Sequence, residues 1–274
     1  MIENVLLNSF LSLILVVFSS SSLGVLVLWK KMSYFGDALS HSILFGIVIG
    51  VLFDIDQKLS LILFCIIFSL LVINLSKNNY FSKDTMVMIS SYFFISFALI
   101  LNDFAINSLN FTSYIFGDPL SVEKKEILYL AIIACAVFAY IFIFYRKIII
   151  VNINQDLAKI EGVKVEKINF MFLILLTITI AISIQIVGIF LMTALLVLPA
   201  SIARIFSRSP MQMFILSLLI GLTISITAFN VANIFNLSIS PTIIFLFSIT
   251  FFVILMSSII LKICSKYFLD KLKK

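Results

Sequence analysis

Long apolar stretches, most of them close to twenty residues, are the feature of this sequence that most restricts its fold. A helix needs about 20 apolar residues to cross the roughly 30 Å hydrocarbon core of a bilayer. Of the 274 residues, 62% are apolar and only 12% are charged, which is too few charges to cover the surface of a water-soluble domain. The sequence therefore predicts an all-α polytopic membrane helical bundle, formed as a single transmembrane domain over residues 1–274.

Eight or nine membrane spans are expected, with short loops between them. They are placed near residues 5–29, 35–53, 59–76, 85–101, 127–145, 168–185, 188–203, 213–234 and 241–263. The apolar run over residues 168–203 would extend about 54 Å as one straight helix, so it is expected to fold back, with the turn at residues 185–188. The first stretch is expected to be a retained span rather than a signal peptide, because it starts beside Glu3 and ends at Lys30 and Lys31.

The basic residues lie at the ends of spans, which is typical of membrane proteins and argues against nucleic-acid binding despite the net charge of +6. If Lys30 and Lys31 are cytoplasmic, alternating spans place 16 of the 19 basic residues inside. This asymmetry predicts an external N-terminus and a cytoplasmic C-terminus. The outer face then carries Glu3, Asp54, Asp56, Asp103, Asp118, Glu123 and Glu126. These acids would attract cations, or they are ordinary solvated loop residues.

One ionisable pair lies near the start of the second span, in the stretch FGDALSHS, which contains the only histidine of the chain. Asp37 and His41 are four residues apart, so a helix places them on one face, where both could reach one cation. Ionisable groups in a membrane helix suggest a pathway or a binding site, and these two ligands suit zinc, manganese or ferrous iron. The alternative is that Asp37 caps the helix while His41 bonds a neighbouring helix.

Two such ligands cannot complete a tetrahedral zinc shell, but a two-fold dimer with this helix at its axis would supply four. A ridge of small residues beside them, Ala38, Ser42, Gly46 and Gly50, would let another helix approach closely. The three cysteines lack the paired spacing of a thiolate site. Met192, Thr193 and Met211 are not assigned as ligands, because methionines in apolar helices usually fill gaps in packing.

The cytoplasmic segment 199–213, PASIARIFSRSPMQM, is longer than a turn requires. It carries a proline near each end and two arginines, which suits a short surface helix lying under the membrane. Such a helix could dock a cytoplasmic partner. The alternative is a basic loop that anchors the neighbouring spans to lipid headgroups.

Several stretches together resemble one known family, the permease subunits of the zinc, manganese and iron ABC importers, and are closest to its zinc branch. They are WKKMSYFGDALSHS (29–42), SYIFGDPLSV (113–122), DLAKIEGVKV (156–165), VGIFLMTALLVLPASIARIFSRSPMQM (187–213) and SPT (240–242). The resemblance implies the type II importer arrangement in a bacterial plasma (inner) membrane. It also implies a homodimer that works with two copies of a cytoplasmic ATP-binding subunit and with an external metal-binding protein.

The same resemblance implies that Asp37 and His41 line the metal pathway, and that zinc, manganese or iron is the transported substrate rather than a cofactor. The implied ATPase-docking residues are Ala200, Ala203, Arg204, Arg208 and Met211. The chain has no G-x-x-x-x-G-K-[ST] phosphate loop, so it is expected to be a transport subunit and not an enzyme.

Two other classes of membrane protein are alternatives. A secondary transporter driven by an ion gradient would usually show paired repeats and several intramembrane acids. A membrane-embedded enzyme would need further ligands or a nucleophile beside Asp37 and His41. The sequence shows one acid well inside a span, no convincing repeat and no such nucleophile.

Overall fold

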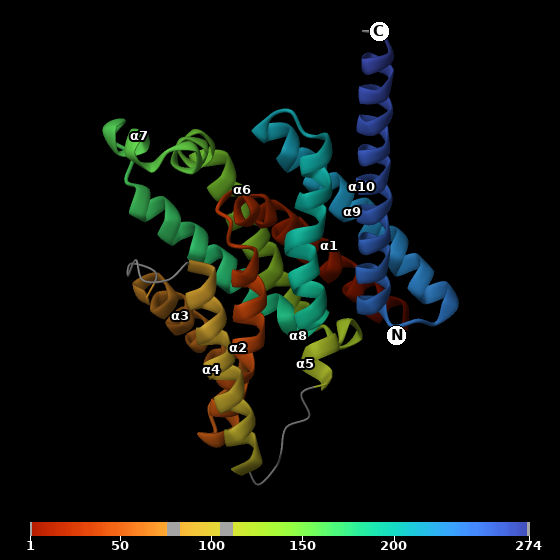
Figure 1. Cartoon of the computed structure of the whole chain (residues 1–274). Coiled ribbons are helices and arrows are strands. Elements are labelled where there is room, and N and C mark those ends of the chain that lie inside the picture. Colours follow the sequence, from red (N-terminus) through yellow and green to blue (C-terminus); the bar gives the residue numbers. More distant parts are fainter. Residues whose placement is uncertain (1, 76–82, 105–111, 273–274) are drawn as a thin grey trace.

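Helices make up all the regular secondary structure in the residues described by the computed structural model, 2–75, 83–104 and 112–272 (Figure 1). In chain order they are α1 (Ile2–Trp29), α2 (Ser33–Leu52), α3 (Gln57–Leu75), α4 (Lys83–Phe104), α5 (Thr112–Phe116), the 3-10 turn η1 (Pro119–Ser121), α6 (Lys124–Ile153), α7 (Gln155–Ile160), α8 (Val165–Phe206), α9 (Pro210–Phe235) and α10 (Ile239–Leu272). The expected cytoplasmic Lys77, Lys273 and Lys274 lie outside these residues. The predicted all-α membrane bundle is confirmed.

The expected number of spans was slightly too high. Within the described ranges, seven helices are long and apolar enough to cross a membrane. Two expected spans, 168–185 and 188–203, are counted together in α8, because the backbone turns sharply at Gly188 with no loop between the two halves. The described apolar part of α3, Gln57–Val72, is shorter than the other spans.

A sharp bend divides α8 at Gly188, where the backbone leaves the helical region with φ 81° and ψ 166°. Figure 1 shows the first half of α8 descending toward the bend and the second half rising beside α10. The expected turn at residues 185–188 is therefore confirmed, although it is made by one residue. Glycine is required, because this region of φ and ψ is essentially closed to other residues.

The bend also packs closely against the end of α5. Gly117, with φ 72°, lies so close to Gly188 that a Cβ added at Gly188 would be 2.5 Å from the Gly117 nitrogen and 2.6 Å from the Ile115 oxygen. Two carbonyl groups freed by the bend find partners: the Val187 carbonyl accepts a hydrogen bond from Ser240 Oγ at 3.0 Å, and the Gln185 carbonyl accepts one from the Asp118 amide at 3.3 Å. Unpaired backbone groups are costly in a membrane, so these bonds stabilise the bend.

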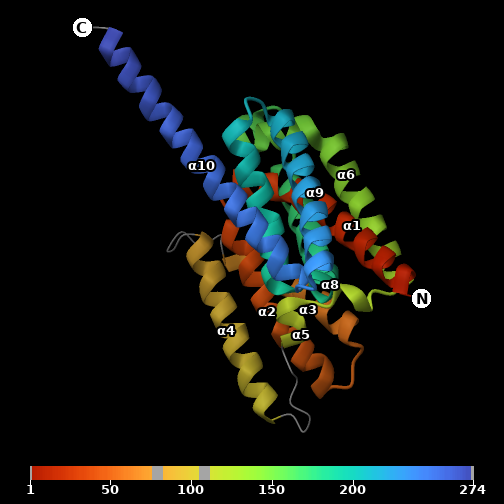
Figure 2. The same cartoon turned by 90° about the vertical axis from the view of Figure 1, so that its right-hand side faces the viewer.

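Helices α2, α3 and α4 form a group at one side of the bundle, seen at the lower left of Figure 1 and again below the rest in Figure 2. The predicted small-residue ridge is confirmed at two positions. A Cβ at Gly46 would be 2.8 Å from Phe64, and one at Gly50 would be 3.0 Å from Ser60. Ser60 Oγ also donates a 2.6 Å hydrogen bond to the Gly46 carbonyl, so α3 packs directly on the α2 backbone.

Contacts between helix ends support alternating crossings. At one end of the bundle, Lys30 after α1 hydrogen-bonds Asn169 near the start of α8 at 2.5 Å. At the other end, Ser9 near the start of α1 donates a 2.6 Å hydrogen bond to the carbonyl of Pro119 in η1. Segments that are predicted to lie on opposite sides of the membrane are therefore found at opposite ends of the bundle. Which end faces the cytoplasm stays a prediction.

The segment 199–213 does not form a separate surface helix, so that prediction was wrong. α8 continues through Pro199 to Phe206, and α9 begins at Pro210 after a short break. Ser209 caps α9 by accepting a hydrogen bond from the Gln212 amide at 3.2 Å. A proline is tolerated inside α8 because neighbouring helices in a membrane bundle can compensate for the lost backbone hydrogen bond.

Candidate functional site

Asp37 and His41 meet on one face of α2, as their spacing predicts. His41 Nε2 lies 3.5 Å from Asp37 Oδ1, and the side chains are 32% and 50% exposed for His41 and Asp37 respectively. Met32, and not Asp37, holds the N-cap position of α2 and makes no side-chain capping bond, so the structure does not support a capping role for Asp37. Both groups remain open to a ligand.

A cavity of about 260 Å³ lies between α2 and α4 beside this pair. It is lined by Tyr34, Asp37, Ala38 and His41 of α2, and by Met88, Ser91, Tyr92 and Ile95 of α4. None of the sequence motifs lies on α4. A helical period identifies one face of a helix, but it cannot identify which neighbour packs against that face.

A second and larger hollow, of about 730 Å³, opens on the other side of Asp37. It is lined by Ser33, Tyr34 and Asp37 of α2, Ile115 and Phe116 of α5, residues 190–198 of the second half of α8, and the start of α10 from Ser240 to Ser248. Four of the five stretches behind the family resemblance therefore meet at one hollow. Apart from Asp37, its lining consists of apolar, hydroxyl and tyrosine side chains.

This arrangement gives each chain one imidazole and one carboxylate for a divalent cation. In the described part of the chain, no group of three or more His, Cys, Asp or Glu side chains could hold a metal. A zinc ion prefers four ligands, so the pair alone forms an incomplete site. An incomplete site of this kind suits a cation in passage, which must be released again.

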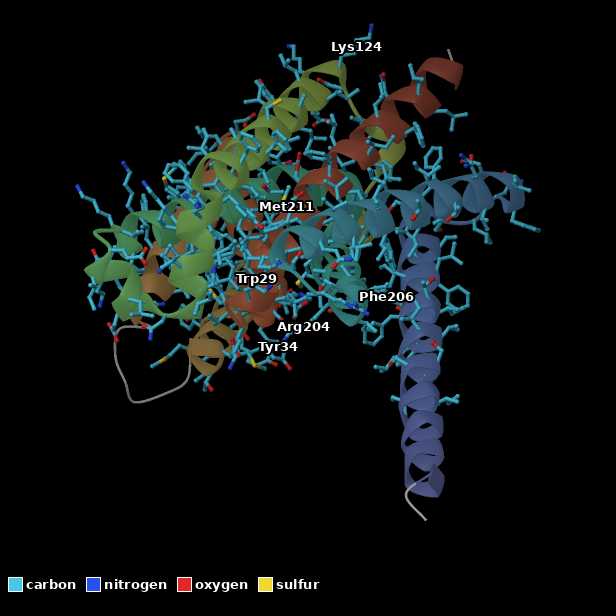
Figure 3. The ribbon with its side chains drawn as sticks, turned by 90° about the horizontal axis from the view of Figure 1, so that it is seen from above. Trp29, Tyr34, Lys124, Arg204, Phe206 and Met211 are labelled. Atoms are coloured by element: carbon cyan, nitrogen blue, oxygen red, sulfur yellow. The ribbon has the colours of Figure 1, made fainter. Side chains whose placement is uncertain are left out.

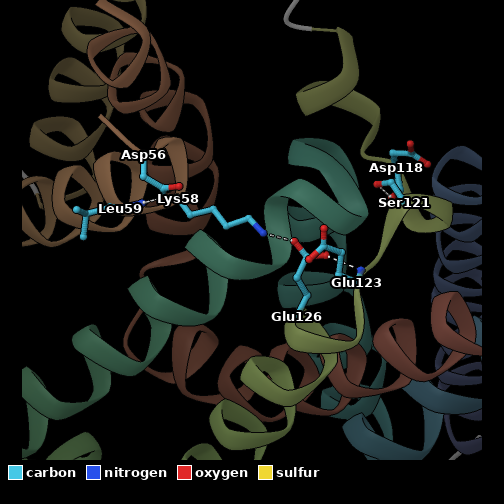
Figure 4. Close-up of polar contacts among 7 residues, drawn as sticks. All are labelled: Asp56, Lys58, Leu59, Asp118, Ser121, Glu123 and Glu126. Carbon is cyan, nitrogen blue, oxygen red and sulfur yellow. Dashed lines mark hydrogen bonds and ion pairs between the residues drawn. The ribbon is translucent and has the colours of Figure 1, made fainter. Parts of the chain in front are cut away.

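Acidic residues gather at the end of the bundle that carries η1 and the start of α6 (Figure 4). Lys58 Nζ bonds Glu126 Oε1 at 2.7 Å, and Glu126 Oε2 accepts the Glu123 amide at 3.1 Å. Asp56 Oδ1 accepts the Leu59 amide at 3.0 Å. Several of these acids thus have local structural partners, which favours the interpretation of ordinary loop residues for them.

The predicted docking residues separate into two sets. Ala200 and Ala203 are fully buried inside the chain at 0% exposure, so they offer no surface to a partner in this structure. Arg204, Arg208 and Met211 are exposed. Figure 3 labels Arg204 and Met211 together with the exposed Phe206 and with Trp29.

Trp29 holds this region in place from the end of α1. Its Nε1 contacts Met213 Sδ at 3.2 Å, and its ring packs edge-on against Phe214 with centroids 5.3 Å apart. The start of α9, directly after the turn that follows α8, is therefore packed against the end of α1.

Comparison with known proteins gives a consistent result. The ABC 3 transport family matches residues 2–258. The high-affinity zinc uptake system membrane protein ZnuB of Buchnera aphidicola subsp. Baizongia pistaciae is 38% identical over 235 residues, covering 84% of this chain and 88% of that protein. The manganese import system permease protein ScaB of Streptococcus gordonii is 25% identical, covering 90% of each chain. Among solved structures, PsaBC from Streptococcus pneumoniae in complex with Fab is similar, with a TM-score of 0.78, 26% identity and coverage of 90% of this chain and 89% of that one.

Proposed function

Because this chain belongs to the ABC 3 transport family, and is a permease subunit of a metal transporter of that family, we propose that it conducts zinc into the cytoplasm. The relative with 38% identity is a zinc uptake membrane protein, whereas the manganese permease of Streptococcus gordonii is 25% identical. Manganese is the second candidate cargo on the strength of that relative.

The observation that carries the proposal is the position of Asp37 and His41. The pair lies on one helix face, and Asp37 lines both the cavity against α4 and the larger hollow formed by α5, α8 and α10. A cation moving through this region meets one carboxylate and one imidazole in each chain. In a two-fold homodimer with α2 near the axis, two chains would offer four such ligands, the number that zinc prefers.

Transport is driven, in this proposal, by two copies of a separate cytoplasmic ATPase, and an external metal-binding protein delivers the cation. The exposed turn between α8 and α9, with Arg204, Arg208 and Met211, is the surface for the ATPase. The N-terminus lies outside and the C-terminus in the cytoplasm of a bacterial inner membrane. This orientation rests on the charge asymmetry of the loops.

Uptake of radioactive zinc at matched membrane abundance tests the proposal. Asp37→Asn replaces an ionised ligand with a weaker neutral oxygen and removes a charge that offsets the charge of the cation in a poorly solvated region. His41→Ala removes the nitrogen ligand. Both variants should insert, bind the ATPase and lose most zinc uptake.

Asp156→Asn is the matched control, because it removes the same charge from a carboxylate that is 86% exposed on α7, away from both hollows. It should transport normally. Wild-type uptake by Asp37→Asn would refute the proposed metal site. A parallel assay with radioactive manganese decides the cargo, since faster uptake of manganese than of zinc at equal concentration would contradict the zinc proposal.

A further inference from the structure

Two helix faces with the same spacing meet beside the proposed metal ligands. On α2 the cavity is lined by positions 34, 37, 38 and 41, and on α4 by positions 88, 91, 92 and 95. Both sets follow the i, i+3, i+4, i+7 pattern of a single helix face. The two faces therefore enclose the cavity over two helical turns, with Asp37 and His41 on one wall and Met88, Ser91 and Tyr92 on the other.

We infer that the thioether sulfur of Met88 is a third donor to the cation held by Asp37 and His41, and that it makes the site selective for soft or borderline divalent cations. This inference rests on the proposed function, because it assigns a further ligand to the same site. Met88 lies on α4, a helix that contains none of the sequence motifs.

Met88 differs from the other methionines named above in its surroundings. Met192 is fully buried at 0% exposure, where a methionine fills space in the core. Met88 is only partly buried and lines a cavity with a carboxylate and an imidazole. Met88 therefore lines the same cavity as both proposed ligands, where its thioether could reach a cation that they hold.

Donor chemistry then gives the direction of selectivity. Carboxylate and hydroxyl oxygens suit hard cations such as manganese and magnesium, imidazole suits zinc, and thioether sulfur favours softer metals. A site that combines oxygen, nitrogen and sulfur donors therefore binds zinc or cadmium in preference to manganese. The thioether is neutral, so it adds selectivity without trapping the cation, which must leave again.

Aromatic packing limits where the cation can go from this cavity. One turn beyond His41, the Phe45 ring packs against Phe94 and Phe97 of α4, with centroids 5.3 Å and 5.2 Å apart. These rings close the groove between α2 and α4 on that side. Tyr34 and Asp37 line both this cavity and the larger hollow, so the two spaces lie on either side of these residues.

Cation binding to the full-length permease, purified with its ATPase partner and with every cysteine replaced, tests the inference. Cd²⁺ serves as the soft probe and Mn²⁺ as the hard one. Met88→Leu nearly conserves side-chain volume, and it should weaken Cd²⁺ binding at least tenfold while changing Mn²⁺ binding less than twofold. X-ray absorption at the cadmium edge should detect a sulfur neighbour in the parent protein and lose it in Met88→Leu.

Two further variants make the result decisive. Met192→Leu removes a sulfur outside the cavity and should keep both the affinity and the sulfur signal. Met88→Cys places a thiolate donor at the same position and should restore a sulfur neighbour, with Cd²⁺ affinity at or above that of the parent. A sulfur signal that persists in Met88→Leu, or an equal loss of Cd²⁺ and Mn²⁺ affinity, would overturn the inference.

The same assay separates this inference from the function on which it rests. If Asp37→Asn abolishes Cd²⁺ binding while Met88→Leu leaves it unchanged, the metal site stands and only the role of Met88 is lost. If Asp37→Asn leaves Cd²⁺ binding at its parental strength, the proposed metal site itself fails.

Discussion

Replacing Gly188 with alanine should destabilise the protein severely, because this residue makes the bend in α8. The backbone conformation, φ 81° and ψ 166°, is one that alanine rarely adopts, and holding it there costs about 1 to 3 kcal/mol. The new Cβ would also lie 2.5 Å from the Gly117 nitrogen and 2.6 Å from the Ile115 oxygen. Relieving such overpacking costs about another 1 to 3 kcal/mol.

The total of about 2 to 6 kcal/mol corresponds to a fall in melting temperature of about 5 to 20 °C for a chain of this size. The assay is thermal unfolding of the purified permease in detergent, followed by the loss of the monodisperse fraction on size exclusion. Zinc uptake should fall as well, since α5 lines the hollow beside Asp37 and would be pushed aside.

Gly162→Ala is the matched control. Gly162 also has a positive φ, 75°, but an added Cβ would meet no atom within 4 Å. Only the backbone penalty remains there, about 1 to 2 kcal/mol. Equal melting temperatures for Gly188→Ala and Gly162→Ala would refute the argument that close packing of α5 against the bend stabilises the fold.

Three further predictions concern the surfaces of the bundle. In a background with every cysteine replaced, Lys159→Cys should be protected from an impermeant thiol reagent in intact cells and Asp56→Cys should react; labelling of Lys159→Cys from outside would reverse the proposed orientation. Lys58→Glu should lower the melting temperature by a few degrees, because the ion pair with Glu126 is partly exposed and contributes at most about 1 kcal/mol. Combining Lys58→Glu with Glu126→Lys should restore stability; failure of the double variant to recover would argue against a direct ion pair. Arg208→Glu should leave the melting temperature unchanged and abolish the stimulation of ATP hydrolysis by the loaded binding protein; normal stimulation would place the ATPase elsewhere.

Features set by local sequence were predicted well. The apolar runs located the helices, the excess length of residues 168–203 indicated the bend, and the four-residue spacing of Asp37 and His41 placed them together. Each of these follows from helix geometry and from the thickness of a bilayer. The pairing of α2 with α4 depends instead on which faces pack together, which no single helix encodes.

The turn between α8 and α9 shows a different limit. Pro199 suggested a helix break, but α8 continues through it, and Ala200 and Ala203 lie buried on its inner face. Proline normally ends a helix in water, whereas a membrane bundle can compensate for the missing hydrogen bond with neighbouring groups. The arginines of this segment were correctly expected at the surface, because charged side chains rarely find partners inside a membrane.

The single-residue bend in α8 also bears on how the chain enters the membrane. Between Lys167 and Arg204 the sequence contains no charged residue, so neither half of α8 nor the turn between them has to carry a charge through hydrocarbon. The two halves can therefore insert together as a helical hairpin. The Val187 carbonyl at its tip receives its hydrogen bond from Ser240, so this bond cannot form before the first residues of α10 have been synthesised. Ser240 follows Val187 by 53 residues, so at about 5 to 20 residues per second the bond that closes the turn becomes possible only several seconds after the turn itself has been translated.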